Sequence, residues 1–224
     1  MILNDASTIW LFDYDLTLYF ESERAVLNSL DRRISLYVQK ILGCDFEKAQ
    51  EIRKEYLRDY GTTLAGLRAK FGVSPDDFFD FIHEPEFLIY PEPAPQKREF
   101  LMRLKGPRYI FTNGRSDWSR TGCKRMGIYD CFRRIVGLED LNWEGKPQIS
   151  AYEKMESVLI EDGVTEKIFP EKIILLDDSL KNLKPAVERG WRTIWVNSSL
   201  EPKPNFVHEK VENLIKLGIR NEEC

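Results

Sequence analysis

Two carboxylates stand two positions apart at the end of an apolar run, in the stretch WLFDYDLTLYF at residues 10–20. Side chains alternate along a β-strand, so Asp13 and Asp15 are expected to point to one side and Tyr14 to the other. Two like charges that are held close together and partly out of water need compensation, which a divalent cation supplies. The alternative is that the aspartates cap a turn or the helix that follows.

Three further polar clusters accompany β-rich runs later in the chain. Thr112 ends the run RYIFT and Asn113 follows it, Lys146 precedes a proline, and Asp177 and Asp178 follow KIILL. Taken singly, each has an ordinary structural explanation as a turn, an exposed lysine or a helix cap. Taken together, they suit a phosphate and a hard cation, because carboxylate oxygens bind magnesium while cations and N–H donors bind phosphoryl oxygens.

Such a set of groups can hydrolyse a phosphate monoester, a reaction that is extremely slow without a catalyst. An aspartate can attack phosphorus to form an aspartyl-phosphate, and a second carboxylate can protonate the leaving oxygen and then activate water. The chain has only two histidines, His83 and His208. That number argues against a His-rich zinc site and against a Ser/His catalytic pair.

The elements that must position these residues form an α/β pattern. Short β-rich runs alternate with helical segments, which predicts a doubly wound parallel sheet with crossover connections. The predicted strands cover residues 8–14, 108–112, 133–137, 172–177 and 193–197. Ligands bind beyond the carboxyl ends of such strands, where the polar clusters are expected to meet. The periodicity of NFVHEKVENLIKLG, at 205–218, predicts a final helix that packs on the sheet.

A helical segment interrupts this pattern after the first strand. Apolar spacing, caps and glycines predict four helices, over residues 21–42, over 46–60, from Thr62 or Thr63 to Gly72, and from Ser74 onward. The proline-spaced connector at 91–95 ends the segment. The predicted organisation is therefore an α/β catalytic core of residues 1–18 and 95–224 with an all-helical cap of residues 19–94, and hinges near 18–21 and 91–95.

Four stretches, FDYDLTL, FTNGRSD, GKPQISAYEKM and ILLDDSLKNLKPAVERGW, resemble in order the four motifs of the haloacid dehalogenase (HAD) superfamily of aspartate-nucleophile phosphotransferases. The helical insertion matches the position of that family's cap domain. Within the superfamily, the DDS-x-x-N pattern, Trp191 and YGTTLAGL at 60–67 resemble the pyrimidine 5'-nucleotidase type.

The resemblance implies a role for each matching residue. Asp13 is expected to be the nucleophile and Asp15 the acid and base. Thr112 and the main-chain amide of Asn113 are expected to bind the transferring phosphoryl group. Lys146 is expected to offset the charge of Asp13 and of the phosphate.

The resemblance also implies a magnesium site. Asp13, the main-chain carbonyl of Asp15, and Asp178 are expected to bind Mg²⁺, and Asp177 is expected to hold a metal-bound water. The second aspartate of the first motif favours phosphate ester chemistry, because the dehalogenases of the superfamily do not need Asp15 as a leaving-group acid.

The expected substrate is a small phosphorylated metabolite, with a pyrimidine nucleoside 5'-monophosphate as the first choice and a sugar phosphate or another small phosphate ester as the alternative. In the cap, Tyr60, Thr62 and Thr63 are predicted to contact the substrate, although a turn between helices explains them equally well. Aromatic candidates for a wall against a base are Tyr19, Phe20, Tyr56, Tyr60 and Phe71.

Two non-enzymatic alternatives remain open. Receiver domains of signalling relays place an acidic cluster, a threonine and a lysine on a similar sheet. They are about half this length, lack a helical insertion, and carry their phosphorylated aspartate after a later strand. A protein that binds a phosphorylated ligand without hydrolysing it would release no phosphate.

Composition and charge indicate which classes of partner the protein can have. The chain has 224 residues and a formal charge of −4, and its pI near 5.5 argues against polymeric nucleic acid as a partner. There is no apolar run of about 18 residues, as a membrane span requires, and the first nine residues lack signal-peptide character. These features predict a cytoplasmic protein, and the spacing of the four cysteines predicts free thiols.

Overall fold

The computed structural model describes residues 2–217 and 219–221. Its centre is a six-stranded sheet in which all neighbouring strands are parallel, in the order β4-β3-β2-β5-β6-β7. The strands are β2 (Ile9–Phe12), β3 (Arg108–Phe111), β4 (Arg134–Val136), β5 (Ile173–Asp177), β6 (Arg192–Val196) and β7 (Glu209–Val211). After β2 the chain adds β3 and β4 on one side of β2, and then adds β5, β6 and β7 on the other side. The crevice at the carboxyl ends of β2 and its neighbours is therefore the expected ligand site.

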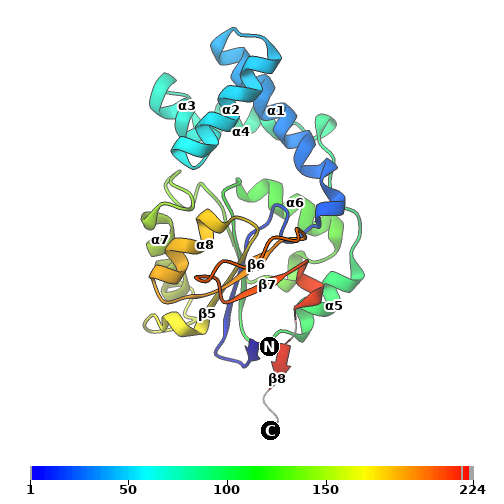
Figure 1. Ribbon diagram of the computed structural model, residues 1–224, viewed down its shortest axis with the longest axis vertical. Coiled ribbons are helices and arrows are strands. Elements are labelled where there is room, and N and C mark those ends of the chain that lie inside the picture. The colour runs from blue at the N-terminus through cyan, green and yellow to red at the C-terminus, as the bar shows by residue number, and fades with distance from the viewer. Residues whose placement is uncertain (1, 218, 222–224) are drawn as a thin grey trace.

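Helices cover both faces of the sheet. They are α5 (Pro95–Arg103), α6 (Ser116–Met126), α7 (Ile149–Glu161) and α8 (Leu180–Glu188). Figure 1 shows α7 and α8 on one side of the strands and α5 and α6 on the other. This arrangement follows from right-handed crossovers, because the chain moves in opposite directions along the sheet in its two halves. The α/β doubly wound fold predicted from the sequence is confirmed.

Four helices lie between β2 and α5, and Figure 1 shows them together beyond one end of the sheet. They are α1 (Ala25–Leu42), α2 (Phe46–Tyr60), α3 (Thr63–Phe71) and α4 (Pro75–Ile82). The side chain of Asp45 caps α2 by accepting a hydrogen bond from the Lys48 N–H at 2.8 Å. Gly43 ends α1 with a φ of 65°, a conformation that glycine adopts without strain. The predicted start at Glu21 is a 3₁₀ turn, η1 (Glu21–Glu23).

The carboxyl-terminal prediction is wrong. Residues 205–218 were expected to form a helix, but β7 pairs in parallel with β6 at the sheet edge, and the 3₁₀ turn η5 (Leu214–Lys216) follows. Three apolar residues of this segment, Val207, Val211 and Leu214, are buried. A helix and a strand can bury these three side chains equally well. The strand is favoured here because β7 pairs with the otherwise open edge of β6. Gly218 lies outside the described residues.

The remaining short elements lie at the periphery. Strands β1 (Ile2–Asn4) and β8 (Ile219–Asn221) form a two-stranded parallel sheet that joins the two ends of the described chain. Further 3₁₀ turns are η2 (Pro85–Phe87), η3 (Tyr129–Cys131) and η4 (Pro170–Lys172). Cys44, Cys123 and Cys131 are free thiols, as predicted, and Cys224 lies outside the described residues. Among the helices described, none combines the length and apolar character needed to cross a membrane.

Candidate active site

A buried lysine joins two aspartates at the carboxyl end of the sheet. Asp13 directly follows β2, and its N–H donates to the Leu176 carbonyl of β5 at 2.8 Å. The Nζ of Lys146 lies 2.9 Å from Asp13 Oδ1 and 2.6 Å from Asp177 Oδ2, and it donates to the Phe111 carbonyl at 2.7 Å. Both Lys146 and Asp177 are fully buried. Three segments that are far apart in the sequence therefore meet at one ammonium group.

Burial and neighbouring charges together set the pKa values of this cluster. Burial raises the pKa of Asp13 well above its usual range, Lys146 opposes this effect, and the neighbouring carboxylates reinforce it. Burial tends to lower the pKa of Lys146, but the charges of Asp13 and Asp177 raise it overall. Lys146 is therefore a buried cation that lies between the carboxyl groups of Asp13 and Asp177.

Three carboxylates lie close enough to share a cation. One oxygen from each of Asp13, Asp177 and Asp178 lies within 4.8 Å of the others. Burial, and then the charge of Asp177, raises the pKa of Asp178 to about 7. Hard oxygen ligands and an excess of negative charge over the single Lys146 fit a divalent cation such as Mg²⁺. The side chain of Asp15 is not part of this group.

Asp177 is also held in place by its neighbours. Its Oδ1 accepts hydrogen bonds from the Ser179 N–H at 2.8 Å and from Asn182 Nδ2 at 3.0 Å. Both donors come from the start of α8, so the DDS-x-x-N stretch forms one local unit. Asn182 is a site residue to which the sequence analysis assigned no role, although the pattern contained it.

Asp15 has different partners. Its Oδ1 accepts hydrogen bonds from Tyr19 Oη at 2.7 Å and from Trp118 Nε1 at 3.0 Å. Burial raises the pKa of Asp15, and these two hydrogen bonds oppose the rise. Tyr14 is fully buried and does not line the cavity, as the expected alternation of side chains requires.

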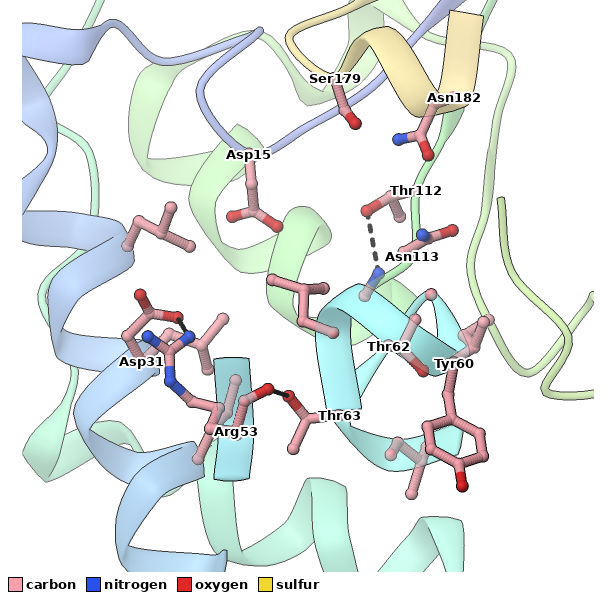
Figure 2. Close-up of a pocket in the computed structure, with 18 of the residues that line it drawn as sticks. Asp15, Asp31, Arg53, Tyr60, Thr62, Thr63, Thr112, Asn113, Ser179 and Asn182 are labelled. Carbon is pink, nitrogen blue, oxygen red and sulfur yellow. Dashed lines mark hydrogen bonds and ion pairs between the residues drawn. The ribbon is translucent and has the colours of Figure 1, made fainter. Parts of the chain in front are cut away.

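Thr112 and Asn113 follow β3 and face the same site (Figure 2). Thr112 Oγ1 accepts a hydrogen bond from the Gly114 N–H at 3.0 Å. Asn113 Nδ2 donates to the Lys146 carbonyl at 2.7 Å, and the Lys146 N–H donates to Asn113 Oδ1 at 2.8 Å. The side chain of Asn113 thus positions the backbone of Lys146, a contact that the sequence analysis did not foresee.

A cavity of about 770 Å³ lies between this cluster and the inserted helices. Its core side includes Asp13, Asp15, Thr112 and Asn113. The wall from α1 and α4 is largely apolar, with Leu27, Leu30, Ile34, Phe78, Phe79 and Ile82. An ion pair interrupts it, with Arg53 Nη1 of α2 lying 2.6 Å from Asp31 Oδ1 of α1 (Figure 2).

The predicted cap residues all line the cavity, but two of them also have structural partners. Thr62 Oγ1 caps α3 by accepting from the Ala65 N–H at 3.0 Å, and Thr63 Oγ1 donates to the Arg53 carbonyl at 3.3 Å. Tyr60 is partly buried at the cavity wall.

Four of the five aromatic candidates for a wall against a base lie outside the lining of this cavity. Of the five aromatic candidates only Tyr60 lines this cavity, because Tyr19 and Tyr56 are buried in packing and Phe71 is exposed.

Arg53 and Asp31 were missed as site residues, since no spacing in the sequence connects two charges on different helices.

Comparison with solved structures identifies the fold of this chain. No family model matches the chain. The structure of CbbY from Rhodobacter sphaeroides in complex with phosphate superposes with a TM-score of 0.63 and 20% identity, covering 95% of this chain and 96% of that one. The magnesium-bound HAD-hydrolase YfnB from Bacillus subtilis has a TM-score of 0.59 and 21% identity, covering 92% and 95%. The protein has the haloacid dehalogenase fold.

The chain is also similar in sequence to a yeast protein. Phosphate metabolism protein 8 of Saccharomyces cerevisiae is 28% identical over 142 residues, which is 58% of this chain and 43% of that protein. The match thus spans less than half of the yeast protein.

In the HAD fold of this chain, the four motif stretches converge on one edge of the sheet, where Asp13, Thr112, Lys146 and Asp177 lie.

Proposed function

We propose that this protein is a magnesium-dependent phosphomonoester hydrolase that acts through an aspartyl-phosphate on a pyrimidine nucleoside 5'-monophosphate. The carrying observation is the placement of Asp13 at the cavity between the sheet and the inserted helices, with Lys146 on one carboxylate oxygen at 2.9 Å and the Asp177–Asp178 pair within cation-sharing distance. The phosphate-bound CbbY and the magnesium-bound YfnB support this chemistry by their shared fold.

The proposed reaction has two displacements. Asp13 attacks phosphorus, the ester P–O bond breaks, and Asp15 donates a proton to the leaving oxygen. Asp15 then accepts a proton from water as that water attacks phosphorus, which breaks the bond to Asp13 and releases phosphate. The raised pKa of Asp15 suits the acid role. When bound, Mg²⁺ offsets the charge of the phosphoryl oxygens so that a carboxylate can approach them.

The cavity wall supports a nucleobase over a sugar. The apolar side chains of α1 and α4 give a ring a surface to pack on, and the Arg53–Asp31 pair offers adjacent donor and acceptor groups. A pyrimidine presents a donor–acceptor edge of this kind. A sugar phosphate carries several hydroxyls, each of which loses free energy if it is buried without a partner.

The test is phosphate release from UMP, CMP and a panel of sugar phosphates, with Mg²⁺ or with a chelator. We expect Mg²⁺-dependent release that is strongest on UMP or CMP and falls to background in Asp13→Asn. A preference for sugar phosphates would overturn the nucleotide substrate alone. Binding of these esters without release of phosphate would overturn the hydrolase and favour a ligand-binding or signalling protein.

A further inference from the structure

One oxygen of Asp15 receives both of its hydrogen bonds. Tyr19 Oη and Trp118 Nε1 both donate to Oδ1, at 2.7 and 3.0 Å, and no hydrogen bond to Oδ2 is present among the residues described. Figure 2 shows the Asp15 carboxylate directed into the cavity. A protonated carboxyl group carries its proton on one oxygen only. With Oδ1 occupied as an acceptor, Oδ2 is the oxygen that can carry the proton.

The two donors are rigidly placed. Tyr19 is fully buried and Trp118 is 2% exposed. The Tyr14 ring and the Trp118 indole form a T-shaped pair with a centroid distance of 6.2 Å, and the Tyr90 ring lies 5.1 Å from the indole. A side chain packed on several sides cannot turn its N–H away, so its direction is set before substrate arrives.

The cap completes this aromatic packing. His83, which directly follows α4, stacks on Trp118 with a centroid distance of 5.8 Å and an interplanar angle of 25°. Its Nδ1 lies 3.0 Å from Asp117 Oδ1, and the same oxygen accepts from the Trp118 N–H at 2.8 Å. The indole is thus held between the core and the inserted helices.

We propose that Trp118 and Tyr19 are positioning residues that hold Asp15 with Oδ2 facing the leaving oxygen of the substrate. The inference rests on the proposed function and deepens it, because it assigns the geometry of the proton transfer to two side chains outside the matching positions of the four motifs. Neither residue touches the substrate; each acts through Asp15.

The alternative is that both aromatics only stabilise the core. The chain offers a matched control in Trp191, which is also fully buried and donates its indole N–H to a carboxylate, Glu156 Oε1, at 3.1 Å. Trp191→Phe makes the same chemical change as Trp118→Phe, but away from the site. Tyr19→Phe removes only a hydroxyl, so it keeps the test valid even if Trp118→Phe folds poorly.

The experiment compares kcat/KM for two leaving groups in the Mg²⁺-loaded protein. The p-nitrophenolate of p-nitrophenyl phosphate leaves without a proton, whereas an alkoxide needs one. The alkyl ester is UMP or, if the wild type does not accept it, the best sugar phosphate of the panel. We expect Trp118→Phe and Tyr19→Phe to lower kcat/KM for the alkyl ester about 10- to 100-fold and for p-nitrophenyl phosphate less than about threefold. Trp191→Phe leaves the ratio of the two values unchanged.

Equal losses on both esters, or no loss on the alkyl ester, would overturn the positioning role while leaving the hydrolase intact. Absence of phosphate release from every ester by the wild type would overturn the proposed function, and the positioning role with it.

Discussion

At the scale of single residues, the site is dominated by an imbalance of charge. Asp13, Asp177 and Asp178 converge, and one lysine, Lys146, offsets them. Burial makes each uncompensated carboxylate unfavourable, so the group responds by binding protons or a cation. Burial, and then the charge of Asp177, accordingly raises the pKa of Asp178 to about 7.

Mg²⁺ is expected to raise the melting temperature more at about pH 8 than at about pH 5.5. The pKa of Asp178 rises from 3.8 to about 7 on folding, so between these values the folded protein keeps a proton that the unfolded chain releases. The metal-free fold therefore loses stability as the pH rises through this range. Above about pH 7 no proton has to be displaced from Asp178, and the cation stabilises the fold fully.

Thermal unfolding with and without Mg²⁺ at the two pH values measures this effect. Asp178→Asn is the control and is expected to abolish most of the Mg²⁺-induced shift at both values. An equal Mg²⁺-induced shift in the wild type at both pH values would contradict the expectation.

At the scale of elements, helix α6 packs tightly against the loop that follows β2. Gly122 of α6 faces Tyr14, and a Cβ at this position would lie 1.6 Å from Tyr14 Oη. That hydroxyl has no hydrogen-bond partner among the described residues. The absent side chain of Gly122 is what lets the helix approach the loop that carries both Asp13 and Asp15.

Gly122→Ala is expected to lower the free energy of unfolding by about 1–3 kcal/mol. Alanine favours a helix by about 1 kcal/mol over glycine, but the clash with a fully buried tyrosine outweighs this gain. Chemical denaturation measures the change. The double variant Gly122→Ala with Tyr14→Phe removes the clashing hydroxyl and is expected to recover part of the loss. A higher free energy of unfolding in Gly122→Ala would contradict this expectation and would show that the loop can shift at little cost.

At the scale of the whole molecule, the inserted helices complete the cavity that the sheet begins. Besides His83, the cap contacts the core through Asp80, whose carboxylate lies 2.9 Å from Arg115 Nη1. Both parts of the chain therefore line the cavity. The domain limits at residues 18/19 and 94/95, and the hinges beside them, stay predictions.

Arg53→Leu is expected to lower kcat/KM for UMP relative to kcat/KM for a sugar phosphate by about tenfold or more, because Arg53 is proposed to contact the base. Loss of a buried hydrogen-bonding partner is worth about 1–3 kcal/mol, and 1.4 kcal/mol corresponds to a factor of 10. Steady-state kinetics on the two substrates measure the ratio.

The chain supplies a matched control for Arg53. Arg33 is another cap arginine paired with an acid, Glu84. It is buried and packs against the Phe81 and Phe87 rings at 4.1 and 4.5 Å. It does not line the cavity. Arg33→Leu is expected to lower stability and to leave the substrate ratio unchanged. A similar change of the ratio in both variants would show that Arg53 has only a structural part.

The sequence by itself determined the order and type of most elements. Buried strands read as apolar runs, and helices of the insertion carry caps and glycines at their ends, because these signals depend on neighbours a few residues away. It also determined which strand ends carry polar residues, and hence that Asp13, Thr112 and Asp177 would meet. It failed for residues 205–218, because a strand of three residues is too short to show a period and its pairing depends on a distant edge.

Only the tertiary structure decided which side chains complete the site. Trp118 donates to a residue 103 positions away, and Arg53 pairs with an aspartate 22 positions away on another helix. Neither contact leaves a local pattern, because a tryptophan or an arginine on a helix has the same sequence signature whether it packs, pairs or positions a neighbour. Their partners are set by how helices pack on the sheet and on one another, which is a property of the folded chain as a whole.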